Sequence, residues 1–189
     1  MNVYDFDNTI FRGDSTARFL AFCACRYPRI WRHFPGIARA GVAFLRKKMA
    51  KTAFKQKLFE FLVSLPDTHS AVDLFWQKNE RHIKFWYPEQ QKADDVIISA
   101  SPEFLIAPLA QKMGFHLIAS RVNPENGVYS GINCDGEEKV TRFRAEFPSI
   151  VPDTFYSDSY SDNPMARISA KAYFVKGDTL IPWEERFPS

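Results

Sequence analysis

The chain has 189 residues, of which 46% are hydrophobic and 15% aromatic, and it carries a formal net charge of +3. This is enough apolar material for the core of one domain, or of one domain with an insertion. Its three cysteines (Cys23, Cys25 and Cys134) are an odd number without metal-ligand spacing, which argues against a disulfide framework. We identify no signal peptide and no apolar run near the roughly 18 residues of a membrane span, so we expect a cytoplasmic protein.

Two aspartates follow the first predicted strand, residues 2–5. Asp5 and Asp7 stand where this short apolar strand ends, so both carboxylates can lie at the carboxyl edge of a sheet, where open α/β sheets bind ligands. Two such acids repel each other unless a cation lies between them, and their hard oxygen atoms suit Mg²⁺. Taken alone, the Asp-x-Asp spacing is also common in surface turns.

A long stretch without a convincing strand follows. It separates the first Asp pair from the next motif by too many residues for one crossover connection. We therefore expect a helical cap, residues 14–91, inserted into a core made of residues 1–13 and 92–189. Apolar periodicity with breaks at Pro28, Pro35-Gly36 and Pro66-Asp67 predicts four helices. They cover residues 15–26, 30–47, 52–64 and 69–84.

The first half of this insertion, residues 15–59, is strongly basic. It contains no Asp or Glu, and aromatic side chains are interleaved with its eleven Lys and Arg residues. A basic, aromatic-rich stretch fits an anionic membrane surface, and an equally good alternative is a solvated helix face that attracts a small anionic substrate. No recognition motif supports nucleic acid as a partner. The eleven cations are Arg18, Arg26, Arg29, Arg32, Arg39, Arg46, Lys47, Lys48, Lys51, Lys55 and Lys57.

A run of β-branched residues predicts a buried strand at residues 95–99, which ends in Ser99, Ala100 and Ser101. Pro102 and Glu103 then open an amphipathic helix that extends to Met113, and its free N–H groups can bind an anion. The alternative is that the serines only cap this helix.

A third strand is predicted at residues 115–119, with residues 127–132 forming part of a hairpin after it. Lys139 opens the next predicted helix, 139–146, although helix N-termini favour negative charge. A site that needs a cation beside a phosphate would explain this lysine, and an exposed lysine in a mixed-charge turn is the plainer alternative.

Another apolar strand, 153–157, ends in Asp158, and Asp162 follows four residues later, before a helix that Pro164 begins. These two acids can complete an oxygen-ligand site with the first Asp pair, although aspartates at such positions are also common helix caps. A last strand is predicted at 172–175. Strands that alternate with helices predict a parallel sheet with helices on both faces, which is an α/β fold.

These motifs resemble those of the haloacid dehalogenase superfamily, in the branch that includes phosphoserine phosphatase. The Ser-Ala-Ser-Pro and Ser-Asp-Ser-Tyr-Ser-Asp-Asn-Pro-Met segments are similar to a subgroup that contains bacterial phosphatidylglycerophosphate phosphatases. Residues 157–162 depart from the Gly-Asp-Gly-x-Asn-Asp string of phosphoserine phosphatases. The resemblance implies a Rossmann-like parallel sheet with an inserted helical cap. It rests on Asp5-Phe6-Asp7-Asn8-Thr9, Ser99, Lys139 and Asp158 with Asp162.

The resemblance also implies roles for the motif residues. Asp5 is expected to be the nucleophile that forms an aspartyl-phosphate, and Asp7 the general acid and base. Ser99, Ala100 and Lys139 are expected to bind the phosphoryl group. Mg²⁺ is expected to be held by Asp5, the Asp7 main-chain oxygen and Asp158, with Asp162 orienting its coordination shell. The acid at position 7 favours a phosphatase, because dehalogenases of this superfamily lack it.

We therefore expect a Mg²⁺-dependent phosphatase that acts on a small phosphorylated substrate. Four alternatives stay open for the function. The substrate is a membrane phospholipid such as phosphatidylglycerophosphate, or a soluble metabolite such as phosphoserine or a sugar phosphate. A phosphotransferase is the third alternative. A non-catalytic binding module is the least favoured, because every catalytic position is filled. A peripheral contact with an anionic membrane through residues 15–59 accompanies the first alternative.

Overall fold

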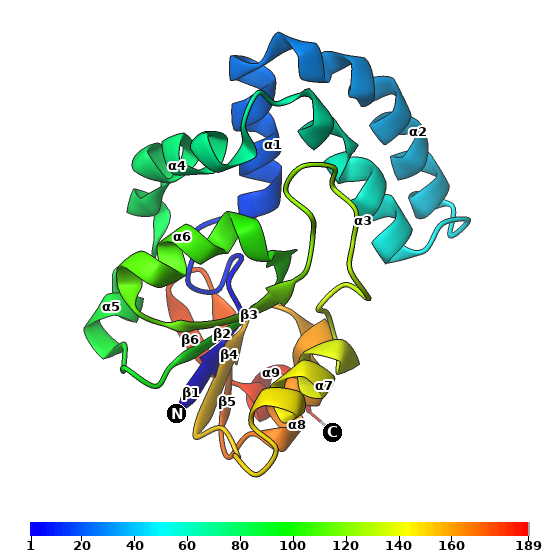
Figure 1. Ribbon diagram of the computed structural model, residues 1–189. Helices are drawn as coiled ribbons and strands as arrows, with labels where there is room; N and C mark the ends of the chain where they lie inside the picture. Colours follow the sequence, from blue (N-terminus) through cyan, green and yellow to red (C-terminus); the bar gives the residue numbers. More distant parts are fainter. Residues whose placement is uncertain (189) are drawn as a thin grey trace.

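The computed structural model describes residues 1–188 and contains a six-stranded sheet, which lies in the lower half of the view in Figure 1. The strand order is β3-β2-β1-β4-β5-β6, and neighbours pair in parallel except for β6, which is antiparallel to β5. The predicted α/β fold is confirmed. The strands are β1 (Asn2–Tyr4), β2 (Val96–Pro102), β3 (His116–Ser120), β4 (Thr154–Ser157), β5 (Ala172–Lys176) and β6 (Thr179–Pro182).

All five predicted strands are present, each within three residues of its predicted bounds, whereas the short edge strand β6 was not predicted. The central strand β1 pairs with β2 on one side and with β4 on the other, which places Val3 beside Val96 and Phe155. These three side chains belong to one apolar cluster, while the next residues, Tyr4 and Ile97, belong to the cluster on the opposite face. Both faces of the sheet are therefore buried, as a parallel sheet requires.

The segment between β1 and β2 is helical. The predicted helix 30–47 is instead a 3-10 helix followed by α2, because Pro35 lies in the first turn of a new helix. Similarly, the predicted helices 52–64 and 69–84 end in 3-10 turns, and α5 was not predicted. The elements are α1 (Ser15–Arg26), η1 (Pro28–His33), α2 (Phe34–Leu45), α3 (Lys51–Phe59), η2 (Glu60–Ser64), α4 (Thr68–Asn79), η3 (Glu80–His82) and α5 (Trp86–Gln90).

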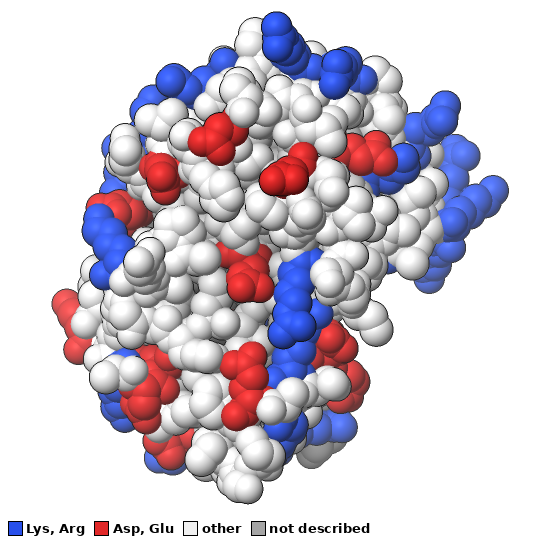
Figure 2. Space-filling model, in the orientation of Figure 1, with Lys and Arg blue, Asp and Glu red and all other residues white. Residues whose placement is uncertain are grey.

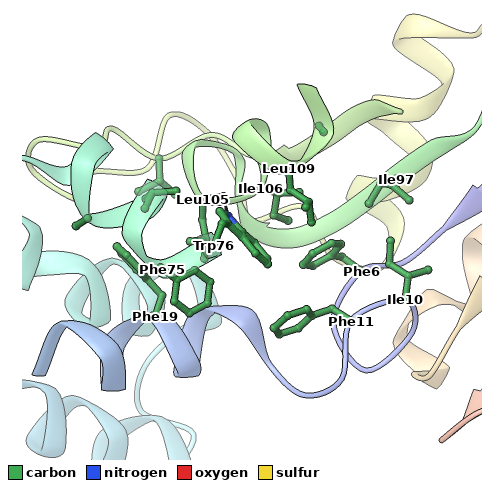
Figure 3. Close-up of a cluster of buried hydrophobic side chains, with 14 of the residues drawn as sticks. Phe6, Ile10, Phe11, Phe19, Phe75, Trp76, Ile97, Leu105, Ile106 and Leu109 are labelled. Carbon is green, nitrogen blue, oxygen red and sulfur yellow. Dashed lines mark hydrogen bonds between the residues drawn. The ribbon is translucent and has the colours of Figure 1, made fainter. Parts of the chain in front are cut away.

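A cluster of buried aromatic side chains joins this helical segment to the sheet (Figure 3). Phe6 and Phe11, from the loop after β1, stack with centroids 5.5 Å apart, and Trp76 of α4 meets both rings edge-on. The Trp76 indole N–H donates to the Leu105 carbonyl at 2.6 Å. The base of the helical segment is thus fixed to the loop that carries the first Asp pair.

Helix α6 (Glu103–Met113) follows β2, and a long loop after β3 reaches back toward the helical segment (Figure 1). The predicted hairpin at 127–132 is reduced to a single antiparallel bridge between Val122 and Tyr129. Gly127 has a φ of +74°, and a Cβ at this position would lie 2.4 Å from the Phe59 carbonyl oxygen. Any side chain here would therefore push the loop away from α3.

Two further helices complete the fold before the last strands. Helix α7 (Glu137–Glu146) begins two residues earlier than predicted, so the premise that Lys139 opens it is wrong. Glu137 and Glu138 occupy the first turn, where negative charge is favourable. Helix α8 (Asn163–Ile168) has Pro164 in its first turn, as predicted, and α9 (Trp183–Arg186) closes the described chain.

Candidate active site

Asp5 lies at the carboxyl end of β1, at the centre of the sheet edge. Its backbone N–H donates to the Tyr156 carbonyl of β4 at 2.8 Å, which extends the pairing of the two strands by one residue. The carboxylate is buried, with Oδ1 2.6 Å from the Lys139 Nζ and Oδ2 accepting from the Thr9 hydroxyl at 3.3 Å. The side chain is therefore fixed through both of its oxygens.

Lys139 is a buried cation, only 1% exposed, that bridges two acids, one after β1 and one in the 3-10 turn after β4. Its Nζ donates to Asp5 at 2.6 Å and to Asp162 Oδ2 at 2.7 Å. Burial by itself lowers the pKa of Lys139, but the charges of Asp162 and Asp5 outweigh it, so this pKa lies above its ordinary value. The lysine is charged at any physiological pH.

The two acids that follow β4 have different surroundings. Asp162 is 2% exposed, and its Oδ2 also accepts from the Ser157 hydroxyl at 2.7 Å, while its Oδ1 is buried without a hydrogen-bond partner among residues 1–188. Asp158 lines the open pocket, and its backbone N–H donates to the Thr9 hydroxyl at 3.0 Å. In the described chain, neither carboxylate accepts a capping hydrogen bond from a helix N-terminus, so the alternative that these aspartates serve only as helix caps is wrong.

Asp7 lies on the same pocket but has no cation bonded to it in the described structure. Its Oδ1 accepts from the backbone N–H of Ser15 at 2.6 Å, and its Oδ2 accepts from the Ser101 hydroxyl at 2.5 Å. Burial raises the pKa of Asp7 to about 6, and the charge of Asp14 contributes to the rise. A carboxyl group with this pKa can carry or release a proton near neutral pH.

The last residues of β2 place only part of the predicted phosphate site on the pocket wall. Ala100 and Ser101 line the pocket, whereas Ser99 is 1% exposed and its hydroxyl accepts from the Ser101 backbone N–H at 3.1 Å. The sequence suggests a helix-cap role for Ser101. In the structure the cap position of α6 is Pro102, and no side chain forms a capping hydrogen bond there. The hydrogen bond from Ser101 to Asp7 could not be predicted from the sequence, because no residue spacing indicates it.

The pocket itself has a volume of about 380 Å³ and lies between the sheet edge and the helical segment. The motif acids and Lys139 form its floor. Its opposite side is contributed by helices α1 to α3 and combines two lysines with an apolar wall. The residues on that side are Leu20, Phe44, Lys51, Phe54, Lys55 and Leu58.

Lys55 connects the two sides of the pocket. Its Nζ donates to the Ala100 carbonyl at 2.8 Å and to the Asn133 Oδ1 at 3.0 Å, so α3 is bonded to the end of β2. Lys51 forms an ion pair with Asp135 at the rim. Both lysines belong to the basic stretch of residues 15–59. Their position on the pocket opposite the acids depends on how α3 packs at the end of the sheet, so residue spacing could not predict it.

The charges of this site fit a divalent cation. Asp5 and Asp162 share one buried cation, Lys139, and Asp158 forms no ion pair in the described chain. Burial together with the neighbouring carboxylates raises the pKa of Asp5 to about 7 against the opposing effect of Lys139. Burial and the charge of Asp162 also raise the pKa of Asp158. The unpartnered Oδ1 of Asp162 and the carboxylate oxygens provide hard ligands. Within residues 1–188 there is no ready-made group of three or more His, Cys, Asp or Glu side chains around one metal position, so main-chain oxygens and water would complete the coordination.

Comparison with known proteins identifies the family. The sequence profile described as haloacid dehalogenase-like hydrolase matches residues 3–167. The chain belongs to this family. Among its relatives, Protein CicA of Caulobacter vibrioides is 28% identical over 185 residues, covering 88% of this chain and 81% of CicA. A probable phosphatase of Mycobacterium tuberculosis is 34% identical over 93 residues, which are 45% of this chain and 32% of that protein.

Solved structures show the same fold at low sequence identity. A protein of unknown function from Bordetella pertussis superimposes with a TM-score of 0.74 at 18% identity, covering 92% of this chain and 88% of that one. A phosphoserine phosphatase, solved as a phospho-aspartyl intermediate analogue, has a TM-score of 0.51 at 13% identity and covers 91% and 84% of the two chains. The chain is thus a haloacid dehalogenase-like hydrolase with phosphatases among its relatives and structural neighbours.

Proposed function

We propose that this hydrolase cleaves phosphate monoesters in a Mg²⁺-dependent reaction through an aspartyl-phosphate on Asp5. The observation that carries the proposal is the different bonding of two acids on one pocket. Asp5 is paired with the buried Lys139 at 2.6 Å, while Asp7 is held by a hydroxyl and an amide and has a pKa of about 6. A cation bound beside Asp5 would lower its raised pKa of about 7 and leave it as the carboxylate nucleophile, while Asp7 can transfer a proton near neutral pH.

In the first step, an Asp5 oxygen attacks the phosphorus atom as the bond from phosphorus to the leaving alcohol oxygen breaks. Asp7 donates its proton to that oxygen, so the product leaves as a neutral alcohol. Lys139 offsets the negative charge that gathers beside Asp5, and the Ala100 backbone N–H can hold a phosphoryl oxygen, whereas the Ser101 N–H already donates to the Ser99 hydroxyl. The buried position of Lys139 supports this role, because a charge in a desolvated site acts more strongly than one in water.

In the second step, Asp7 takes a proton from a water molecule as that water attacks the phosphorus atom. The bond between phosphorus and Asp5 breaks, which releases inorganic phosphate and restores the carboxylate. The residues suited to hold Mg²⁺ are Asp5, the Asp7 main-chain oxygen and Asp158, with Asp162 orienting its coordination shell. When bound, this ion would supply positive charge to the phosphoryl oxygens and lower the pKa of Asp5.

The helical segment, residues 14–91, acts in this proposal as a cap that selects the leaving group over a core made of residues 1–13 and 92–189. The cap side of the pocket offers two lysines and four large apolar side chains. Such a wall suits a substrate that carries an apolar part beside its phosphate, and we place a phospholipid monoester such as phosphatidylglycerophosphate first. A soluble metabolite would use only Lys51 and Lys55, and phosphotransfer to an alcohol would use the same intermediate.

The test is a panel of phosphomonoesters, with p-nitrophenyl phosphate as the general substrate, assayed with Mg²⁺ and with EDTA. We expect turnover to require Mg²⁺. The Asp5→Asn substitution should reduce the rate by at least about a thousandfold, which is roughly 4 kcal/mol of activation free energy, and Asp73→Asn should leave the rate unchanged. Asp73 is an exposed acid on α4 and serves as the matched control. Full activity in EDTA, or in Asp5→Asn, would contradict the proposal, and the best substrate in the panel decides between lipid and soluble phosphates.

A further inference from the structure

Helix α2 is apolar on its outward face as well as on its inward face. Only one of its 12 residues is charged, Arg39. The inward side contacts α3, where Phe44 and Phe54 stack with ring centroids 4.9 Å apart. On the outward side, Val42 is 47% and Leu45 is 82% exposed. A helix with apolar side chains on all its faces is normally buried on all sides. Helix α2 instead lies at the outer edge of the molecule, so its outward face has no covering element within the described chain (Figure 1).

The structure divides the eleven cations of residues 15–59 into two groups. Four contact an acid or a residue distant in the sequence: Arg18 lies over the Phe11 ring, Lys55 is in the pocket, Lys51 pairs with Asp135, and Lys57 pairs with Glu60. The remaining seven are exposed and form no ion pair with a carboxylate in the described part of the chain, and the contacts of Arg26 with the Tyr27 ring and of Arg32 with His33 are with the adjacent residue. These seven cations are Arg26, Arg29, Arg32, Arg39, Arg46, Lys47 and Lys48.

Six of these seven cations lie on α2 or within five residues of its ends. We call this region the α2 surface, and Figure 2 shows Lys and Arg side chains gathered along the edge of the molecule that α2 and the turn after it occupy in Figure 1. Trp31, 57% exposed, adds an aromatic side chain just before the helix. The α2 surface consists of Trp31, Val42 and Leu45 with Arg29, Arg32, Arg39, Arg46, Lys47 and Lys48.

We propose that the α2 surface docks on an anionic phospholipid bilayer, with α2 lying in the plane of the interface. An interfacial helix places large apolar side chains among the lipid chains and keeps basic side chains at the level of the headgroups. Leu45, Val42 and Trp31 provide the first group, and the six cations provide the second. No helix in residues 1–188 is long and apolar enough to cross a membrane, so the contact is peripheral.

Charge complementarity favours lipid over a second copy of this chain. A symmetric dimer through the α2 surface would bring six cations against six others, with no acid between residues 15 and 59 to offset them. An anionic bilayer instead attracts each exposed cation by about 1 kcal/mol, which is about fivefold in affinity. The proposal does not rest on the phosphatase chemistry, since it concerns residues outside the pocket.

The test is sedimentation of the full-length chain with phosphatidylcholine vesicles, either alone or mixed with phosphatidylglycerol. We expect binding to the anionic vesicles only, and loss of this binding as salt rises from about 0.1 to about 1 M, where the screening length falls from about 10 to about 3 Å. The basic variant combines Arg46→Gln, Lys47→Asn and Lys48→Gln. Asn is used at position 47 because the φ of Lys47 is +56°, a conformation that asparagine tolerates.

The basic variant should bind anionic vesicles about a hundredfold more weakly. An apolar variant, Val42→Gln with Leu45→Gln, should weaken binding at least about tenfold without changing the net charge. Turnover of p-nitrophenyl phosphate should be unchanged in both, which verifies that they fold.

The matched control removes three exposed cations on the opposite part of the molecule, Arg167, Lys171 and Lys176, each changed to Gln. It should retain most of the binding. Equal loss in the control and the basic variant, equal binding to neutral vesicles, or no binding to anionic vesicles at about 0.1 M salt would overturn the proposal. So would full binding by the apolar variant.

Discussion

Replacing Lys139 by Met should destabilise the protein strongly. Lys139 is 1% exposed and forms ion pairs with Asp5 and Asp162 at 2.6 and 2.7 Å. Methionine fills a similar volume but leaves two buried carboxylates without their cation. Removing one partner of a buried ion pair typically costs about 3–5 kcal/mol, because the remaining charge is then uncompensated.

The loss should depend on pH. Even with Lys139 present, the pKa of Asp5 is raised to about 7, and without the lysine it would rise further. An acid whose pKa is raised in the folded state stabilises the fold below its unfolded value of about 4 and loses that contribution as pH rises through the folded value. The variant should therefore approach the parent in stability near pH 4 and show its full deficit at pH 8.

Urea unfolding in EDTA at several pH values measures this difference. Lys112→Met is the matched control, since Lys112 pairs with Glu80 at 2.6 Å but is 64% exposed, and it should cost less than about 1 kcal/mol at every pH. Equal stability of the two variants at pH 8, or a deficit that does not change between pH 4 and pH 8, would refute the reasoning from a buried pair.

Three further predictions concern the pocket and the α2 surface. Mg²⁺ should raise the melting temperature more at pH 8 than at pH 5. The pKa values of Asp5 (about 7) and Asp7 (about 6) are raised, so both acids are largely protonated at pH 5 and bind the cation less well. Equal shifts of the melting temperature at the two pH values would contradict this. Asp7→Asn should still release p-nitrophenol in an initial burst but hydrolyse the phospho-enzyme slowly, and stopped-flow traces without a burst would count against Asp7 as the base. The basic variant of the α2 surface should turn over vesicle-borne phosphatidylglycerophosphate more slowly than the parent and soluble p-nitrophenyl phosphate at the same rate, which paired initial-rate assays can check.

The sequence was most informative about the sheet and its edge. Short apolar runs that end in polar residues predicted β1 to β5, and the same pattern indicated that Asp5 and Asp162 would lie at one edge of the sheet. The family resemblance added Lys139, whose Nζ lies within 2.7 Å of both acids. Local signals suffice here because the carboxyl ends of parallel strands converge on one edge whatever the rest of the chain does. The short antiparallel strand β6 has no such signal.

Contacts across the pocket could not be predicted, because they depend on how the helical segment docks. Lys55 is separated from Ala100 by 45 positions, and Ser15 and Ser101, the two partners of Asp7, are 86 positions apart. The basic stretch shows the same limit. Composition gave eleven cations without acids, but only the packing of α1, α2 and α3 separates the four that contact an acid or a distant residue from the seven that do not.

One helical hairpin connects the pocket with the α2 surface. Phe44 lines the pocket, whereas the next residue, Leu45, is 82% exposed on the outside, and the turn that follows carries three free cations before Lys51 returns to the pocket rim. A bilayer bound at the α2 surface would therefore lie beside the mouth of the pocket. In the proposed function, the apolar wall on that side would contact the acyl part of a lipid substrate, whereas a small soluble phosphate would need no docking. In this arrangement the apolar and basic side chains of one hairpin act together at the membrane. A polar substitution at Leu45 should therefore slow turnover of membrane-borne substrates and leave turnover of soluble ones unchanged.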